Sequence, residues 1–269
     1  MKHFKSNIKN KIPPKKSLGQ NFLVDKNAKR KIISACNLKS NDIILEIGPG
    51  KGAITEEISP LVKKIFAIEK DKRLLKGLNE TFKDTNVSII GEDILKYDFK
   101  SLPNNIKIVG NLPYNIATPI IDKAIKNKEK FNSFYMTVQL EYGERMVAKP
   151  NNKKYGPLSC FIQYHADAKM LFKIKNTCFY PKPKVQSCFL KLTFPKETPF
   201  KAEDEKLFFD VLKTAFCQRR KTVQNSLSPI LDKKILSNLL SKLAINPKLR
   251  AENLSIEDYI RIADTIKKL

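Results

Sequence analysis

The sequence predicts an α/β fold in which a mainly parallel sheet is followed by a small all-helical domain. Three observations support this prediction. Apolar segments of strand length alternate with helical patterns between residues 25 and 138, which is typical of a doubly wound sheet. Polar or glycine-rich residues follow four of these segments, and open α/β sheets bind ligands at that edge. Beyond residue 200 only helical periodicity remains.

The first part of the chain contains five apolar segments that predict buried strands, at 42–47, 65–68, 87–90, 106–109 and 134–138. Apolar residues at helical spacing predict helices around and between them, at 25–36, 54–62, 74–78 and 118–125. We expect Asp25 to cap the first helix. We expect Thr118 to cap the last, with Pro119 at its first position.

The later part of the chain shows first an alternating strand pattern and then helical patterns. Alternation over 186–194 predicts an antiparallel strand, with 168–174 as its partner. Helical patterns follow at 207–215, 227–243 and 256–266. We therefore expect a sheet domain over residues 1–199, which begins with a basic arm at 1–14, and a helical domain over residues 200–269.

The charge balance indicates a polyanionic partner. Lys and Arg number 51 against 27 Asp and Glu in 269 residues, so the formal net charge is +24 and the pI is near 9.8. An excess of this size is typical of proteins that bind nucleic acid. A lysine-rich genome is the alternative explanation, and the two do not exclude each other. The hydrophobic fraction of 42% is sufficient for a well-buried core.

The cysteine pattern indicates reduced thiols in an intracellular, cytoplasmic protein. The five cysteines include no CxxC pair. We expect no metal site, because the two histidines, His3 and His165, lie near no cysteine pair. We expect no membrane association, since no apolar run approaches the length of a span. The basic N-terminus lacks a following apolar stretch, so we expect a phosphate-binding arm rather than a secretory signal, with an organelle transit peptide as the weaker alternative.

A glycine-rich loop follows the first buried strand. Gly48, Gly50 and Gly52 alternate with other residues and open a helical segment, so the backbone there can approach a ligand closely. With Ala53, the string also fits the looser pattern of dinucleotide-binding loops. However, Glu46 stands at the end of the strand, and a carboxylate there suits a cationic ligand better than a pyrophosphate.

Two acidic residues follow the next two strands. Glu69 ends the second strand, where a carboxylate can accept both hydroxyls of a ribose, and Asp93 follows the third, where it can accept from an adenine amino group. Either residue alone could be a solvated loop acid or a helix cap. Together with Glu46 they predict S-adenosylmethionine as the cofactor.

The run from Gly110 to Asn115 suits a flat heterocycle that bears an amino group. Asn111 offers a side-chain carbonyl, Pro113 fixes the backbone and removes a donor, and Tyr114 offers a ring face for stacking. An ordinary turn between a strand and a loop is the alternative.

Four segments resemble the ribosomal RNA adenine dimethyltransferases, and the resemblance covers about residues 15 to 267. They are Lys16-Ser17-Leu18-Gly19-Gln20-Asn21-Phe22-Leu23, Leu45-Glu46-Ile47-Gly48-Pro49-Gly50, the run 110–115, and Phe179-Tyr180-Pro181-Lys182-Pro183-Lys184-Val185. Within this group, the KsgA family dimethylates two adjacent adenines in a hairpin near the 3′ end of small-subunit rRNA. The Erm family modifies an adenine of the large subunit and confers macrolide resistance.

Several features are more similar to the KsgA family than to the Erm family. Leu112 is one, because Erm proteins usually have Ile there. The others are the segments 141–145, 155–159, 218–227 and 250–255.

The resemblance implies specific cofactor contacts. It assigns them to Asn21, Leu23, Gly48, Glu69, Asp93 and Asn111, and the glycine loop adds Gly50. Without the resemblance, the segment from Gln20 to Leu23 is expected to be a helix entry with a buried Phe.

The resemblance also implies catalytic and RNA-binding roles. The Asn111 side chain and the Leu112 carbonyl ahead of Pro113 would orient the adenine amino group, and Tyr114 and Phe179 would clamp the extruded base. Core packing is the alternative for Phe179. The residues expected to bind RNA are Lys182, Lys184, Arg219, Arg220 and Lys221, and a solvated helix face is the alternative for the last three.

The sequence therefore predicts a cytoplasmic, monomeric rRNA adenine dimethyltransferase that uses S-adenosylmethionine and acts on immature small ribosomal subunits. An Erm-type enzyme is the main alternative. A ribosome-assembly or mitochondrial transcription factor on the same fold is the non-enzymatic alternative, and a dinucleotide oxidoreductase is the alternative at the level of the fold.

Overall fold

The computed structural model describes residues 12–269, so most of the basic arm expected at residues 1–14, and His3, lie outside the described residues. The chain divides into two compact units. The sheet unit contains the residues up to Gly143 and Lys169–Phe194, and the helical unit contains Glu144–Ala168 and Pro195–Leu269.

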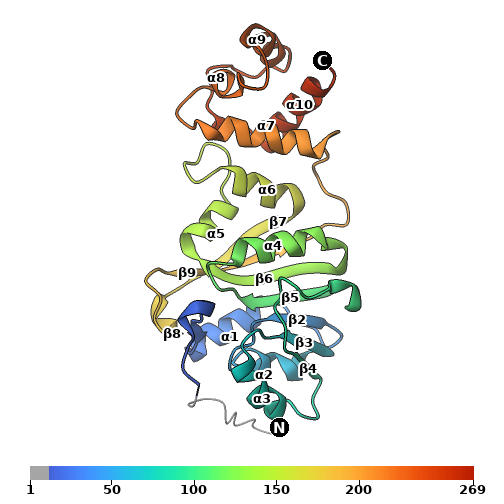
Figure 1. Ribbon diagram of the computed structural model, residues 1–269, viewed down its shortest axis with the longest axis vertical. Helices are drawn as coiled ribbons and strands as arrows, with labels where there is room; N and C mark the ends of the chain where they lie inside the picture. The colour runs from blue at the N-terminus through green and yellow to red at the C-terminus, as the bar shows by residue number, and fades with distance from the viewer. Residues whose placement is uncertain (1–11) are drawn as a thin grey trace. The chain divides into compact units, whose positions relative to one another are not determined.

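A seven-stranded sheet with the order β4-β3-β2-β5-β6-β9-β7 forms the centre of the sheet unit (Figure 1). Its strands are β2 (Ile43–Ile47), β3 (Lys64–Ile68), β4 (Val87–Ile90), β5 (Ile106–Asn111), β6 (Phe131–Gln139), β7 (Asp167–Ile174) and β9 (Ser187–Thr193). The pairs that join β4 to β6 are parallel, and β9 runs antiparallel to β6. The predicted α/β class and the antiparallel final strand are confirmed.

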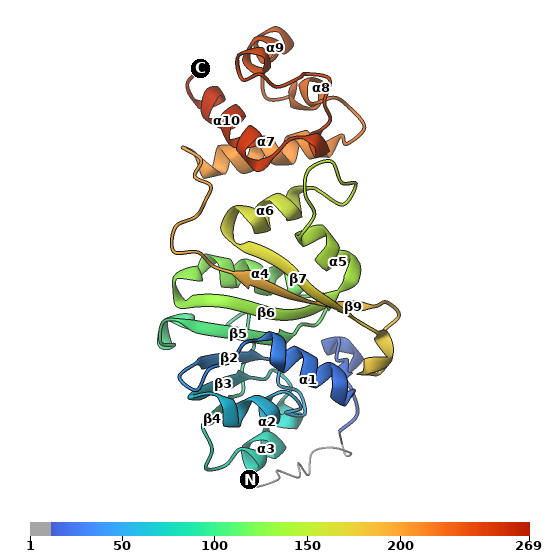
Figure 2. The ribbon, with the colours of Figure 1, turned by 180° about the vertical axis from the view of Figure 1, so that it is seen from behind.

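Helices cover both faces of the sheet. On one face α1 (Lys26–Ala35), α2 (Thr55–Ile58) and α3 (Lys72–Thr81) share a core with the strands, and α4 (Ala117–Lys126) lies on the other face (Figures 1 and 2). Asp25 caps α1 as predicted, because its side chain accepts from the Ala28 N–H at 2.7 Å. This arrangement leaves the carboxyl ends of the parallel strands open to a ligand.

Two predicted helices differ in detail. The helix predicted over 54–62 is one α-helical turn followed by a 3₁₀ turn, Ser59–Leu61, because Pro60 has no N–H to continue the α-helical bonding. The prediction that Thr118 caps α4 is wrong. The helix begins at Ala117, Ile116 occupies the cap position, and the Thr118 hydroxyl lies 3.0 Å from the Tyr142 hydroxyl instead.

A second, two-stranded sheet joins segments that are far apart in the chain. β1 (Phe22–Leu23) pairs antiparallel with β8 (Phe179–Tyr180), with Phe22 opposite Tyr180 and Leu23 opposite Phe179. The expectation of a helix entry at residues 20–23 is therefore wrong. The reason is that this segment pairs with β8, which is distant in the sequence, and backbone pairing between strands keeps it extended. The local sequence does not predict this pairing.

The helical unit contains α6 (Pro157–His165), α7 (Glu205–Cys217), α8 (Val223–Leu227), α9 (Lys233–Lys242) and α10 (Ile256–Lys267). The helix α5 (Leu140–Met146) crosses the division between the units. The division differs from the predicted boundary at residue 200, because Cys160 and Tyr164 of α6 are buried in the same core as Phe208 and Leu212 of α7. Apolar packing thus draws an earlier segment into the helical unit.

Three further features concern the described residues only. None of their helices combines the length and apolar character needed to span a membrane. No group of three or more His, Cys, Asp or Glu side chains among residues 12–269 could hold a metal ion. All five cysteines are free thiols, of which Cys36, Cys160 and Cys188 are buried and Cys217 is exposed.

Candidate functional site

A cavity of about 950 Å³ lies at the carboxyl ends of β2 to β5, within the sheet unit. Its walls come from the segment before α1, the loop after β2, the acidic residues after β3 and β4, and the loop after β5. All the predicted cofactor residues line it: Asn21, Leu23, Gly48, Gly50, Glu69, Asp93 and Asn111. The tertiary structure thus brings together residues that the sequence distributes over five segments.

The loop after β2 has a backbone shape that favours glycine. Gly48 and Gly50 have φ angles of 68° and 61°, values that side-chain-bearing residues rarely adopt. A Cβ atom on Gly50 would also lie 3.0 Å from the Phe22 ring. The Gly50 N–H donates to Glu69 Oε2 at 2.9 Å.

Glu69 is held rigidly at the end of β3. Its Oε1 accepts from the Asp71 N–H at 2.8 Å while Oε2 accepts from Gly50, and the residue is only 6% exposed. Burial raises the pKa of this carboxyl, although the hydrogen bonds from the backbone of Asp71, Gly50 and Lys70 oppose the shift. Each carboxylate oxygen can accept a second bond, so Glu69 can receive two vicinal hydroxyls.

Asp93, after β4, is held as an anion by a neighbouring cation. Lys70 Nζ lies 2.7 Å from Asp93 Oδ2, and the Leu95 N–H donates to Oδ1 at 3.0 Å. Partial burial raises the pKa of Asp93, but the bonds from Lys70 and Leu95 outweigh it and hold the pKa below its ordinary value. The ionised carboxylate is a hydrogen-bond acceptor for an amino group.

Glu46 is a buried carboxyl in the cavity wall. It is 3% exposed, and one of its oxygens accepts from the Thr55 hydroxyl at 2.7 Å. Burial raises its pKa to about 7. The hydrogen bond from Thr55 opposes this shift, and the nearby negative charge of Glu69 adds to it. A cationic ligand would favour the ionised form.

The end of β5 and the loop after it place Asn111 and Leu112 at the cavity. The Asn111 amide nitrogen donates to the Asn21 carbonyl at 2.7 Å, and within residues 12–269 the side-chain oxygen makes no hydrogen bond. The Leu112 N–H donates to Thr137 on β6 at 3.1 Å, and its side chain is 2% exposed. Leu112 and Pro113 both line the cavity.

Tyr114 lies in the same loop and lines the cavity. Its hydroxyl is 2.7 Å from the hydroxyl of Ser187, a fully buried residue at the start of β9. Burial raises the Tyr114 pKa, so the phenol stays protonated. The contact with Ser187 anchors the far end of the ring and restrains its face.

Phe179 does not line the cavity. It is 3% exposed and belongs to the core shared by β1 and α1, while the next residue, Tyr180, is 61% exposed and lines the cavity. The alternation of side chains along β8 explains this, since adjacent residues of a strand point to opposite sides. The structure therefore fits the core-packing alternative for Phe179.

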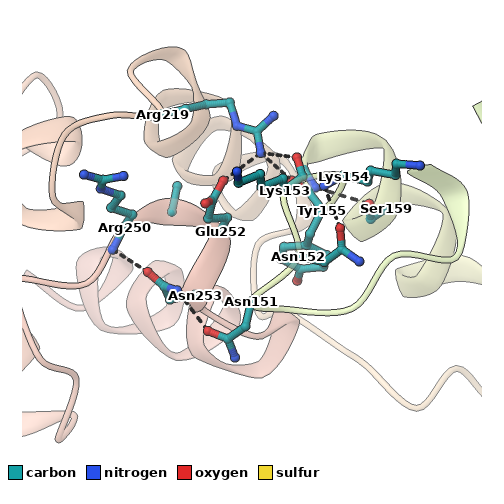
Figure 3. A network of polar contacts seen from close by, with 12 residues as sticks. Asn151, Asn152, Lys153, Lys154, Tyr155, Ser159, Arg219, Arg250, Glu252 and Asn253 are labelled. Carbon is teal, nitrogen blue, oxygen red and sulfur yellow. Dashed lines mark hydrogen bonds and ion pairs between the residues drawn. The ribbon is translucent and has the colours of Figure 1, made fainter. Parts of the chain in front are cut away.

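The five residues expected to bind RNA lie in both units. Lys182 and Lys184 are exposed in the segment after β8, and Arg220 and Lys221 are exposed after α7. Arg219 is different, because its guanidinium donates to the Lys153 and Tyr155 carbonyls and to Glu252 (Figure 3).

The sequence analysis missed three contributors to the site: Lys70, which pairs with Asp93, Ser187, which anchors Tyr114, and the exposed ring of Tyr180. Lys70 directly follows Glu69 in the sequence, so its place at the cavity could have been predicted from that of Glu69. No local pattern reveals Ser187, because it depends on the pairing of β9 with β6.

The parallel sheet with its reversed final strand and the acidic cavity at its carboxyl edge define the class of S-adenosylmethionine-dependent methyltransferases. Residues 13–268 match the family described as ribosomal RNA adenine dimethylase, and the chain belongs to that family.

Curated relatives support this membership. A ribosomal RNA small subunit methyltransferase A from Clostridium botulinum is 41% identical over 256 residues, which cover 93% of each chain. The protein of that name from Francisella tularensis subsp. novicida is 41% identical over 259 residues, which cover 94% of this chain and 98% of the relative.

Solved structures support the fold. A dimethyladenosine transferase from Plasmodium falciparum superimposes with a TM-score of 0.80 at 24% identity and covers 92% of this chain and 98% of its own. The 23S rRNA methyltransferase ErmE superimposes with a TM-score of 0.73 at 22% identity and covers 92% of this chain and all of its own.

Proposed function

We propose that this chain transfers methyl groups from S-adenosylmethionine to the exocyclic amino groups of two adjacent adenosines in a hairpin near the 3′ end of small-subunit rRNA. The products are N6,N6-dimethyladenosines, formed on immature small subunits in the cytoplasm by a monomeric enzyme. The observation that carries the proposal is the Asn111 side chain, held by the Asn21 carbonyl in the same cavity as Glu69 and Asp93. The names of the 41% identical relatives support the small subunit as the target.

The cavity residues fit the cofactor. Glu69 would accept the ribose hydroxyls and Asp93 the adenine amino group, while the loop at Gly48 and Gly50 admits the ligand close to the backbone. Glu46 would balance the positive charge of the methionine part. When bound, the cofactor supplies an electrophilic methyl group on a sulfonium.

The loop after β5 would prepare the nucleophile. An adenine amino nitrogen is weakly nucleophilic because its lone pair is delocalised into the ring. Two fixed acceptors, Asn111 Oδ1 and the Leu112 carbonyl, would bind the amino hydrogens, direct the lone pair at the methyl group and offset the positive charge that develops on nitrogen. The product ammonium is acidic enough to lose its proton to water, so this step needs no strong base.

The base would reach this site by leaving its stack. Extrusion from a helix costs a few kcal/mol, which stacking on an aromatic ring can offset. Tyr114 offers such a ring, and its bond to Ser187 keeps that ring in place.

The test is transfer of labelled methyl from S-adenosylmethionine to small subunits that lack dimethyladenosine, with large-subunit RNA as the parallel substrate. We expect label in small-subunit rRNA as N6,N6-dimethyladenosine at two adjacent positions. Label in large-subunit RNA alone would instead support the Erm-type activity. Cofactor binding without any transfer would support a non-enzymatic assembly role.

A further inference from the structure

The loop after β4 carries part of the cavity wall but has no regular structure of its own. It runs from Gly91 to Asp98, between β4 and the 3₁₀ turn Phe99–Ser101, and contains neither helix nor strand. β4 is an edge strand of the sheet and pairs with β3 (Figure 1). Asp93 and Ile94 of the loop line the cavity. Because the sheet ends at β4, the loop needs support from another element to hold Asp93 in place.

A lysine of α4 supplies that support. Lys123 Nζ donates to the Leu95 carbonyl at 2.9 Å and to the Tyr97 carbonyl at 2.6 Å. The same ammonium lies 4.9 Å from the centre of the Phe99 ring, a distance at which a cation is attracted to an aromatic face. One side chain therefore holds the loop at two carbonyls and contacts the ring at its downstream end.

The two residues that Lys123 holds also hold Asp93. The Leu95 N–H donates to Asp93 Oδ1 at 3.0 Å, and the Tyr97 N–H donates to the Asp93 carbonyl at 3.0 Å. Each of these residues thus accepts from Lys123 through its C=O and donates to Asp93 through its N–H. A shift of either residue would move the Asp93 carboxylate at the cavity.

The surroundings of Lys123 differ from those of an ordinary surface lysine. Burial lowers its pKa, while the negative charges of Glu92, Asp93 and Asp98 oppose that shift and favour the ammonium. Lys126, one residue short of a full turn further along α4, has a side chain that is 70% exposed and pairs with an acid of its own helix. The contrast indicates that Lys123 acts on the loop and that Lys126 does not.

We propose that Lys123 is a positioning residue for cofactor recognition, which holds the loop after β4 so that the Asp93 carboxylate meets the adenine amino group. The inference deepens the proposed function and rests on it in one respect, namely that Asp93 accepts from that amino group. Lys123 itself does not line the cavity and acts through Asp93. The selectivity of the site for adenine in its cofactor thus depends on a residue of the helix that follows the run 110–115.

The first test compares S-adenosylhomocysteine with its deaminated analogue, S-inosylhomocysteine, in calorimetric titrations. The analogue carries an oxygen in place of the amino group, so it cannot donate to Asp93 from that position. The wild-type protein should bind the analogue about 10- to 100-fold more weakly, since a charged acceptor loses its partner. In Lys123→Met we expect the affinity for S-adenosylhomocysteine to fall about tenfold or more, while the affinity for the analogue changes less than about threefold.

A purely structural role of Lys123 predicts a different result. General loosening of the sheet unit would weaken both ligands equally and leave the preference for adenine unchanged, and that result would overturn the proposal. The matched control is Lys126→Met, the same substitution at an exposed position of α4. It should keep the wild-type preference, and an equal loss in this control would also count against a specific role for Lys123.

Amide hydrogen exchange tests the bracing without a ligand. The N–H groups of Leu95 and Tyr97 donate to Asp93, so release of the loop in Lys123→Met should speed their exchange by about tenfold, with no such change in Lys126→Met. Unchanged exchange in Lys123→Met would refute the bracing. If thermal unfolding shows that Lys123→Met does not fold, Lys123→Gln takes its place in both measurements under the same criteria, because its shorter side chain stays polar.

Failure of this inference is distinguishable from failure of the proposed function. If the wild-type protein methylates small subunits and prefers adenine, but Lys123→Met keeps that preference, only the role of Lys123 is wrong. If Lys123→Met loses the preference while the wild-type protein transfers no methyl group, only the proposed activity is wrong. If the wild-type protein binds both ligands equally, Asp93 does not recognise the amino group, and the inference fails together with that assignment.

Discussion

The side chain of Asn111 donates to the backbone carbonyl of Asn21 at 2.7 Å. This bond joins the end of β5 to the segment that precedes α1, two parts of the chain that both line the cavity. Because the amide nitrogen is engaged, the group of Asn111 that has no hydrogen-bond partner within residues 12–269 is the side-chain oxygen. The contact therefore sets the polarity of the site as well as its shape.

Asn111→Ala removes one of the two acceptors expected at the adenine amino group. We expect kcat to fall by about 10² to 10³, since single polar groups that act on the transition state have effects of this size. RNA affinity should change less than threefold. Single-turnover methyl transfer and RNA titration measure the two effects. Asn111→Asp is the informative companion, because it keeps an acceptor but cannot donate to Asn21. Equal losses of turnover and RNA affinity would contradict the orienting role.

Glu69→Gln should weaken cofactor binding by about 10- to 100-fold. The substitution removes a charge-assisted acceptor, worth about 1.5 to 3 kcal/mol, and one of the N–H groups of Gly50 and Asp71 loses its partner. Calorimetric titration with S-adenosylmethionine measures the change. Glu92→Gln is the matched control, because Glu92 also lines the cavity but is exposed. A comparable loss in both variants would point to a general effect of charge.

Glu46 should make stability depend on pH between about 4.5 and 7. Its pKa in the folded state is raised to about 7 from 4.5, so the folded protein binds the proton more tightly than the unfolded chain. Stability is then lost as pH rises through this window, by about 3 kcal/mol. Glu46→Gln should accordingly be stabilising relative to wild type at pH 8 but not at pH 4.5, as measured by urea unfolding. If the difference in the free energy of unfolding between wild type and Glu46→Gln does not vary with pH, the pKa of Glu46 is not shifted by folding.

Phe179 and Tyr180 should respond oppositely to truncation. Phe179→Ala leaves a cavity in the core and should lower the free energy of unfolding by about 3 to 5 kcal/mol. Tyr180→Ala removes an exposed ring at the cavity, so its stability cost should stay below 1 kcal/mol. Chemical unfolding of both variants is the measurement. If Phe179→Ala abolished methyl transfer while unfolding normally, Phe179 would reach the substrate in the bound state and the clamp expected from the sequence would stand.

Local sequence determined the elements of the sheet unit. Strand-length apolar runs and helical spacing placed β2 to β6 and the helices α1, α3 and α4 to within a few residues, because burial on one face requires those periods. The position of Glu69 and Asp93 after strands also predicted their place at the ligand edge, since parallel strands end at a common edge.

Tertiary structure decided what depends on contacts between distant segments. The pairing of β1 with β8 turned residues 22–23 into a strand, buried Phe179 and brought Tyr180 to the cavity. The same kind of long-range bonding engaged Arg219 in bracing a loop rather than leaving it free. Periodicity describes which face a residue occupies on its own element, but partners from elsewhere in the chain decide whether that face meets the core, a ligand or another loop.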